Sequence, residues 1–143
     1  MRATTRGTDK IRALGDVALF ESCTRKELAR IASLADTVDI GQGSVLTREG
    51  SPGREFFVIA DGEADVHIDG EVVARLGPGS HFGEMSLLDQ GPRTATVTAR
   101  TPMTMFVLDG RSFGTLLNEA PAVAKKLLRT LAIRIRDAEG ATA

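Results

Sequence analysis

Closely spaced turns divide the middle of the chain into short apolar runs, and this spacing constrains the fold more than any other feature. The runs are rich in β-branched and apolar residues and are bounded by Gly, Pro and Asp, a pattern typical of strands. They lie at 37–40, 45–48, 55–60, 64–68, 72–76, 94–101 and 103–108. About eight short strands are too many for one flat sheet, so the pattern predicts a double-sheet jelly roll or small barrel.

Two Asp-Gly pairs predict tight turns within this strand-rich region. Asp61-Gly62 and Asp69-Gly70 each stand between two apolar runs. The two-residue turns that connect hairpin strands need positive φ angles, which glycine adopts without strain. We therefore expect a β-hairpin at each pair.

Helical patterns flank the strands on both sides. In the segment 8–36, Thr24 and Glu27 have the spacing of a capping box, and apolar residues follow at helical intervals. In the segment 109–140, Asp109 can cap a first helix and Pro121 can start a second, which should end near Gly140. The apolar side of this second helix should consist of Val123, Leu127, Leu128, Leu131 and Ile135. These patterns predict one mainly β domain, with helices at 8–36, a jelly roll at 37–108 and two helices at 109–140.

Composition excludes several classes of protein. The charge is nearly balanced, with 18 Lys and Arg against 19 Asp and Glu, so no strongly basic composition marks a nucleic-acid binder. No apolar run approaches the roughly 18 residues of a membrane span, and the first residues lack the apolar core of a signal peptide. Cys23 is the only cysteine, which excludes an internal disulfide. We therefore expect a cytoplasmic protein.

The segment 82–97 contains the residues with the clearest binding chemistry. Gly83 and Glu84 open a short apolar turn, a Gly-Pro bend follows, and Arg93 leads directly into a β-branched run. Arg93 can donate two N–H bonds to phosphate oxygens, and backbone amides at the start of the turn can donate to the same anion. Glu84 can accept a hydrogen bond from a hydroxyl but would repel a phosphate. This combination suits a small molecule that carries both a phosphate and a sugar hydroxyl.

The same segment resembles the phosphate-binding cassette of cyclic nucleotide-binding domains, the family of catabolite-activator-type regulators and of cyclic-nucleotide-dependent kinases and channels. The family motif runs F-G-E, a small apolar stretch, and then P-R-[STA]-A-[TS]-V, which this chain matches without a gap. The turn glycines at 50, 53, 62, 70, 77 and 79 also fall where the family places its own. The resemblance implies a double-stranded β-helix, or jelly-roll, barrel between N-terminal helices and two C-terminal helices.

The resemblance also implies a role for each matched residue. Glu84 would bind the ribose 2′-hydroxyl, and Arg93 would pair with the exocyclic phosphate oxygens. The other residues of the cassette around the ligand would be Phe82, Gly83, Met85, Ser86, Thr94 and Ala95. The base would lie against a barrel wall formed by Val66, Val73, Ala74 and Leu76. The last helix would close over the base as a lid, and because the chain has no Trp or Tyr, Arg129 or Ile133 would cap the base instead.

Thr94 does not decide the identity of the nucleotide. In parts of the family a threonine here accompanies cyclic GMP, because its hydroxyl can reach the guanine amino group. Bacterial cyclic AMP binders also use threonine at this position. We expect cyclic AMP as the ligand, with cyclic GMP as the alternative, and neither a cofactor nor a metal.

Other functions have weaker support in the sequence. His67, His81 and Glu84 could form a metal triad, but the paired histidines of metal-binding jelly rolls are absent and Glu84 suits a sugar better. Cys23 precedes a helix start, but no histidine lies near it in sequence to support a catalytic thiol. We therefore expect no enzymatic activity. A degenerate domain that acts as a ligand-independent interaction module would have lost the glutamate or the arginine, and both are present.

The expected mechanism is the transmission of ligand binding to a partner. The 143 residues contain no helix-turn-helix, kinase or channel segment, which indicates a stand-alone sensor without a DNA-binding domain or a fragment of a longer protein. We expect the stand-alone sensor. By resemblance, ligand binding would shift the helix at 109–119 and draw the last helix over the base. The exposed side of the helix at 121–138 would then contact an effector protein of unknown identity. Homodimerisation through the last helix is an open alternative.

Overall fold

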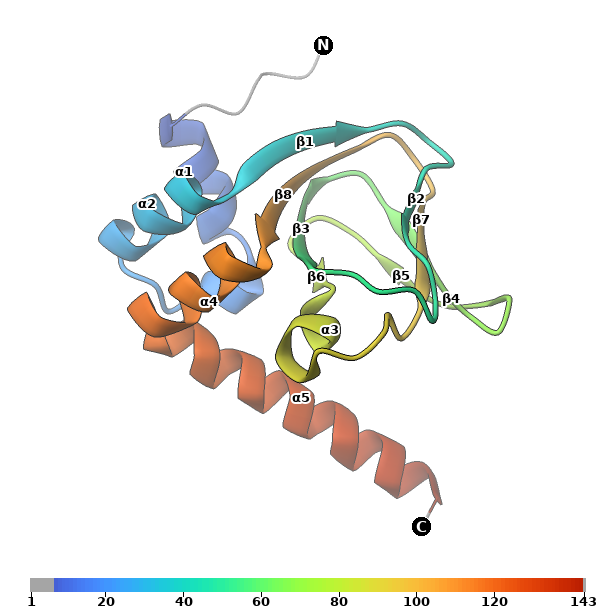
Figure 1. The fold of residues 1–143 in the computed structure, drawn as a ribbon. Coiled ribbons are helices and arrows are strands. Elements are labelled where there is room, and N and C mark those ends of the chain that lie inside the picture. The colour runs from blue at the N-terminus through green and yellow to red at the C-terminus, as the bar shows by residue number, and fades with distance from the viewer. Residues whose placement is uncertain (1–6, 143) are drawn as a thin grey trace.

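Two antiparallel sheets of four strands face each other in the computed structural model, which describes residues 7–142. One sheet has the order β1-β8-β3-β6 and the other the order β2-β7-β4-β5. The strands are β1 (Asp36–Ile40), β2 (Val45–Thr47), β3 (Glu55–Asp61), β4 (Ala64–Ile68), β5 (Glu71–Leu76), β6 (His81–Phe82), β7 (Thr96–Ala99) and β8 (Met103–Asp109). The helices are α1 (Gly7–Gly15), a 3-10 turn η1 (Ala18–Phe20), α2 (Arg25–Leu34), α3 (Glu84–Asp89), α4 (Gly110–Glu119) and α5 (Pro121–Thr142). This arrangement is the predicted jelly roll (Figure 1).

The sheet that contains β3 and β8 is covered on both faces. Successive side chains on a strand point to opposite faces. Phe56 and Val58 of β3 therefore join the helices in one apolar cluster, while Phe57 and Ile59 join a second cluster between the two sheets. Because both faces are buried, the strand is a continuous apolar run rather than an alternating one.

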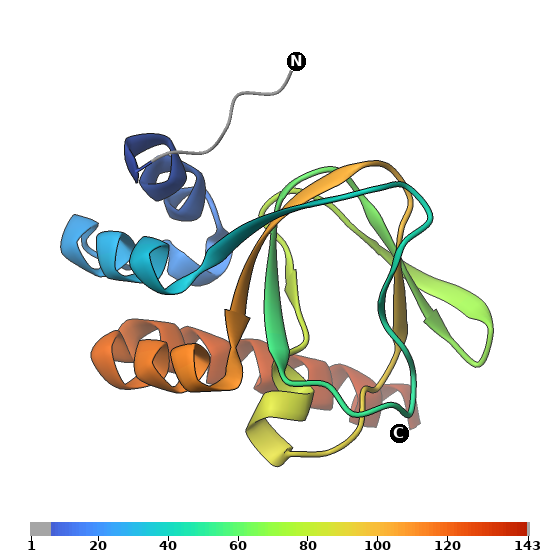
Figure 2. The same cartoon turned by 45° about the horizontal axis from the view of Figure 1, so that its top comes forward.

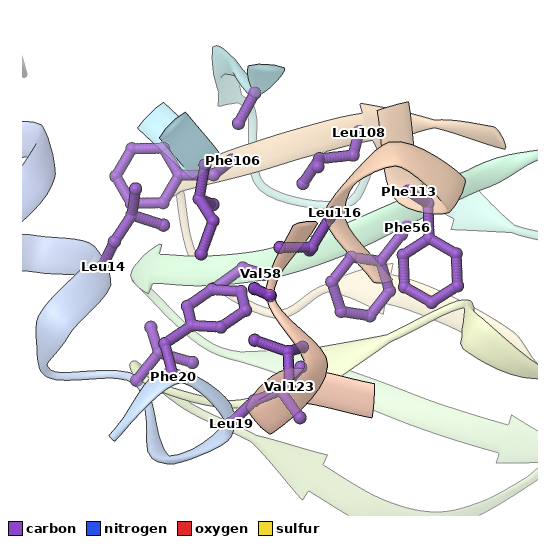
Figure 3. Close-up of a cluster of buried hydrophobic side chains, with 14 of the residues drawn as sticks. Leu14, Leu19, Phe20, Phe56, Val58, Phe106, Leu108, Phe113, Leu116 and Val123 are labelled. Atoms are coloured by element: carbon purple, nitrogen blue, oxygen red, sulfur yellow. The ribbon is translucent and has the colours of Figure 1, made fainter. Parts of the chain in front are cut away.

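α1, η1, α2, α4 and the first half of α5 gather on the outer face of this sheet, on the same side of the barrel (Figure 2). Side chains from η1, β3, β8 and α4 meet in this cluster (Figure 3). The rings of Phe56 and Phe113 lie 4.8 Å apart at an angle of 40°. Offset aromatic pairs of this kind stabilise a core beyond the area that they bury. This packing fixes the start of α4 against the strand that also borders the barrel interior.

The helix starts that were predicted from capping residues are confirmed. Thr24 Oγ1 accepts a hydrogen bond from Glu27 N at 3.1 Å, and Glu27 Oε1 accepts one from Thr24 N at 2.8 Å. At the start of α4, Asp109 Oδ1 accepts a hydrogen bond from Ser112 N at 2.8 Å. In each case a side chain satisfies an amide that the helix itself leaves without a partner.

Only one of the two Asp-Gly pairs forms a hairpin. Asp69 and Gly70 have φ angles of 53° and 82° and connect β4 to β5, which pair with each other. The prediction for Asp61-Gly62 is wrong, because this turn leads from β3 in one sheet to β4 in the other. Since β3 already has β8 on one edge and β6 on the other, it offers no edge to β4.

The region around the cassette also differs from the predicted strand pattern. The strand predicted at 94–101 is shortened to β7, because the backbone of Arg93 pairs with an earlier loop. Arg93 N donates to Ser51 O at 2.8 Å, and Gly50 N donates to Arg93 O at 2.8 Å. The two-residue strand β6 was not predicted, because it is too short to show a periodic pattern and is defined by pairing with β3.

The last helix is longer and less buried than predicted. It continues past Gly140 to Thr142 as a single element that runs beside α3. Val123 and Leu127 are buried, but Leu128 is 67% exposed and Ile135 is 59% exposed, so the predicted apolar side is wrong at these two positions. Leu128 lies about 100° around the helix from Leu127, and Ile135 lies in the second half, beyond the apolar cluster.

None of the helices in the described part of the chain is long and apolar enough to span a membrane.

Candidate functional site

A cavity of about 440 Å³ opens between the sheet of β4 and β5, the β6–α3 segment and the second half of α5. All twelve residues that the sequence predicted around the ligand line it: Val66, Val73, Ala74, Leu76, Phe82, Gly83, Glu84, Met85, Ser86, Arg93, Thr94 and Ala95. Five further residues that were not predicted also line it: Thr47, Ile68, His81, Val97 and Arg134. The wall formed by β4 and β5 is partly open to solvent, since Val73 is 55% exposed.

Arg93 is a buried cation at one end of the cavity. Its side chain is held by backbone carbonyls: Nη1 donates to Gly83 O at 3.1 Å and Nη2 donates to Glu55 O at 3.0 Å. The guanidinium also lies 5.8 Å from the ring centre of Phe57. Burial lowers the pKa of Arg93, while the carboxylates of Glu55 and Glu84 act in the opposite direction. An arginine in this setting stays protonated, and two of its five N–H groups are used, which leaves about three for an anion.

Two glycines make room for this guanidinium. A Cβ at Gly53 would overlap Arg93 Nε and lie 2.5 Å from Arg93 Cζ. Gly83 has a φ of 95°, in the left-handed region, and a Cβ there would lie 2.6 Å from Glu55 O. The position of Arg93 therefore depends on the absence of side chains on both sides.

Glu84 is the first residue of α3 and carries a buried carboxylate, with only 3% of its residue surface exposed. Its Oε1 accepts a hydrogen bond from Arg134 Nη1 at 3.1 Å. The same oxygen lies 3.6 Å from His81 Nδ1, which is longer than a hydrogen bond. Since an ionised carboxylate has about four acceptor positions, Glu84 can accept further hydrogen bonds from a ligand.

The residue of α5 that lines the cavity is neither of the two that were predicted to cap the base. Arg129 and Ile133 are exposed and do not line the cavity, whereas Arg134 does. Arg134 follows Leu127 by seven residues, which is about two turns, so it lies on the same side of α5 as that buried leucine. This spacing from Leu127 is the signal that could have identified Arg134 in the sequence.

The groups considered for catalysis do not form a reactive arrangement. In the part of the chain that the structure describes, no group of three or more His, Cys, Asp or Glu side chains could hold a metal ion. His67 lies apart from the cavity, with Nε2 3.2 Å from Thr98 Oγ1. Burial, together with the nearby carboxylate of Glu27, raises the pKa of the Cys23 thiol to about 11. A thiol with such a pKa is protonated at neutral pH and is a poor nucleophile.

Comparison with known proteins gives a family for this cavity. Residues 37–120 match the family model described as cyclic nucleotide-binding domain. The cAMP-dependent protein kinase regulatory subunit of Schizosaccharomyces pombe is 36% identical over 108 residues, which cover 75% of this chain and 26% of that protein. The chain thus spans about a quarter of the length of this relative.

Solved structures share the same architecture. The structure of cAMP-bound PfPKA-R has a TM-score of 0.81 and 28% sequence identity, over 88% of this chain and 44% of that one. The catabolite activator protein of Thermus thermophilus has a TM-score of 0.78 and 32% identity, over 85% of this chain and 59% of that one. The match at residues 37–120 includes both sheets, the cassette and α4. The chain belongs to the cyclic nucleotide-binding domain family.

Proposed function

We propose that this chain is a sensor module of the cytoplasm that binds a cyclic nucleotide, with cyclic AMP preferred over cyclic GMP, and that it regulates a partner instead of catalysing a reaction. The observation that carries the proposal is that a buried cation, Arg93, and a buried carboxylate, Glu84, line one cavity. The volume of that cavity, about 440 Å³, lies in the range typical of small-molecule sites.

Each part of a cyclic nucleotide would meet a matching part of the cavity. The remaining N–H groups of Arg93 would donate to the exocyclic phosphate oxygens, as charge-assisted bonds. Glu84 would accept a hydrogen bond from the ribose 2′-hydroxyl. The base would lie on the apolar wall of β4 and β5, which includes Val66, Ala74 and Leu76. The relationship to a cAMP-bound structure supports cyclic AMP as the ligand.

The charges of the cavity also suit such a ligand. Arg93 and Arg134 are cations and Glu84 is an anion, so the three groups together carry one positive charge. A cyclic nucleotide carries one negative charge on its phosphate diester and would balance this excess. Without Arg134 the cavity would be neutral before the ligand enters. The proposal therefore links ligand affinity to the position of α5, which carries Arg134.

The link to α5 gives a route for regulation. If the nucleotide strengthens the attachment of α5 to the cavity, a partner that prefers the attached state will in turn favour nucleotide binding. The partner surface would be the exposed side of α5, where Leu128, Ile133 and Ile135 are each more than half exposed. An effector protein or a second copy of the chain could contact this side. A pull-down that recovers the same partner equally with and without nucleotide would contradict this regulation.

A ligand-independent interaction module is the second candidate. It is favoured by the internal contacts of the two charged residues, since Arg93 donates to two carbonyls and Glu84 accepts from Arg134. A site whose charged groups already have partners is stable without a ligand. The two candidates differ in whether a nucleotide binds at all.

Calorimetric titration with cyclic AMP and cyclic GMP tests the proposal. Arg93→Ala should weaken binding roughly thirty-fold to several thousand-fold, because loss of one partner of a buried charge pair costs about 2–5 kcal/mol. Arg93→Lys should also weaken binding, because a point charge does not reproduce the planar fork. Arg100→Ala is the matched control, since Arg100 is exposed and pairs with Glu63 outside the cavity. If the folded wild-type protein binds neither nucleotide, the interaction module is the better account.

A further inference from the structure

His81 is a largely buried cavity residue to which the proposed function gives no role. Its Nδ1 is buried and has no hydrogen-bond partner. Among the side chains that the structure describes, no other buried nitrogen or oxygen atom lacks one. The side chain is 11% exposed and lines the cavity beside Glu84. A buried polar atom without a partner is costly and rare in folded proteins.

The surroundings of His81 fix its ring and leave Nδ1 facing Glu84. β6 pairs His81 with Val58 of β3, and the ring lies 5.6 Å from the ring of Phe56 at a tilt of 42°. Nδ1 is 3.6 Å from Glu84 Oε1. An ionised carboxylate only accepts hydrogen bonds. A neutral imidazole beside it therefore favours the tautomer that carries the proton on Nδ1. Burial keeps this imidazole neutral by lowering the pKa of His81, an effect that Glu84 opposes and Arg134 reinforces.

The two residues beside Glu84 differ in how firmly the fold holds them. Arg134 is a long side chain, 54% exposed, and it comes from α5, the element that the proposed mechanism moves. His81 is rigid, because it belongs to a strand of the barrel and packs against an aromatic ring. A shift of the carboxylate by about 0.7 Å would bring Oε1 to the usual hydrogen-bond distance of about 2.9 Å from Nδ1.

We propose that His81 is a positioning residue for Glu84, and that its Nδ1–H donates to the Glu84 carboxylate when a nucleotide binds. This inference rests on the proposed nucleotide function. The hydrogen bond holds the carboxylate in the orientation that accepts the ribose 2′-hydroxyl. His81 thus contributes to recognition of the sugar without contacting the phosphate or the base.

Affinities for cyclic AMP and for 2′-deoxy cyclic AMP distinguish this role from a merely structural one. His81→Phe keeps the ring against Phe56 but removes the donor, and it should weaken cyclic AMP binding about tenfold or more, because hydrogen bonds to charged groups contribute strongly. Binding of the 2′-deoxy analogue, which lacks the hydroxyl, should change less than about twofold. His81→Asn, which places an amide N–H close to the position of Nδ1, should restore much of the affinity for cyclic AMP.

The matched control is His67→Phe, because His67 is the other histidine of the chain and lies outside the cavity. It should leave both affinities unchanged. In a Glu84→Gln background, His81→Phe should cause little further loss, because the two residues act through one contact.

Two results would overturn the role of His81 while the proposed function stands. One is an equal loss of affinity for both nucleotides in His81→Phe, which would indicate a general packing effect. The other is unchanged affinity for cyclic AMP in both His81 variants, with unfolding curves that confirm their folded state. Failure of the proposed function has a different signature, since the wild-type protein would then bind neither nucleotide and both proposals would be rejected.

Discussion

Arg134 Nη1 donates a hydrogen bond to Glu84 Oε1 at 3.1 Å, and this contact joins the second half of the last helix to the buried carboxylate of the cavity. The two residues are 50 positions apart in sequence. The glutamate end of the contact is 3% exposed, whereas the arginine end is 54% exposed. The pair thus connects the interior of the cavity to an element that solvent can reach.

Removal of this contact should weaken nucleotide binding moderately. Arg134→Ala removes a cation that attracts the phosphate, but the exposure of Arg134 means that solvent screens much of this attraction. We expect cyclic AMP affinity to fall roughly two- to fivefold in calorimetric titration. Arg136→Ala is the control, because Arg136 is exposed on the same helix and does not line the cavity. Tighter binding by Arg134→Ala would instead show that Arg134 competes with the ribose hydroxyl for Glu84.

A methyl group at position 53 should strongly weaken nucleotide binding while the fold persists. Gly53→Ala places a Cβ within the space of the Arg93 guanidinium, and a flexible side chain can move away where a backbone cannot. We expect a loss of cyclic AMP affinity comparable to that of Arg93→Ala, about thirty-fold or more, with a thermal unfolding midpoint close to that of the wild type. Gly77→Ala is the matched control, because a Cβ at Gly77 meets no atom within 4 Å. Unchanged affinity in Gly53→Ala would show that Arg93 keeps its function after it is displaced.

His81 should make the stability of the protein sensitive to mild acid. Burial lowers the pKa of folded His81 below its ordinary value of 6.5, so the unfolded chain binds a proton at a higher pH than the folded protein does. The contribution of neutral His81 to the free energy of unfolding is complete above pH 6.5. It is lost as the pH falls from 6.5 toward the lower pKa of His81 in the folded protein.

Denaturant unfolding at a series of pH values measures this effect. The free energy of unfolding of the wild type should decrease between about pH 6.5 and pH 5, above the range near pH 4 in which carboxylates titrate. His81→Phe should show a smaller decrease over the same range. Identical slopes for the wild type and His81→Phe would contradict a lowered pKa of His81.

The capping box at the start of α2 should contribute measurably to stability. Thr24→Ala removes the acceptor of the Glu27 amide, and loss of such a cap typically costs about 1 kcal/mol. Thr24→Ser retains the hydroxyl and should keep most of the stability. Denaturant unfolding provides the measurement, and nucleotide affinity should remain unchanged because Thr24 does not line the cavity. If Thr24→Ser lost as much stability as Thr24→Ala, the hydrogen bond of the hydroxyl would not be the cause of the stabilisation.

The features that the sequence predicted correctly depend on local chemistry. Turn residues and short apolar runs predict the jelly roll, because each turn and strand is specified by neighbouring residues. The same reasoning applies to Glu84 and Arg93, which lie in one continuous segment and both line the cavity. Thr24 and Asp109 predicted helix starts for the same local reason.

The features that escaped prediction depend on how distant segments meet. Arg134 reaches Glu84 only because of the rotation and path of α5. The residues predicted to cap the base, Arg129 and Ile133, do not line the cavity. His81 gains significance only from the pairing of β6 with β3 and the placement of α3. Asp61-Gly62 has the residues of a hairpin turn, but the occupied edges of β3 prevent one.

The division of β3 into two faces limits how this strand can change in evolution. Phe56 belongs to the helical cluster, while its neighbour Phe57 faces the barrel interior near Arg93. Insertion or deletion of a single residue would exchange the two faces and place the wrong ring on each side. Individual apolar substitutions can be absorbed by repacking, but a change in length cannot. We therefore expect related sequences to vary in composition here and to keep an invariant number of residues between Glu55 and Ile59.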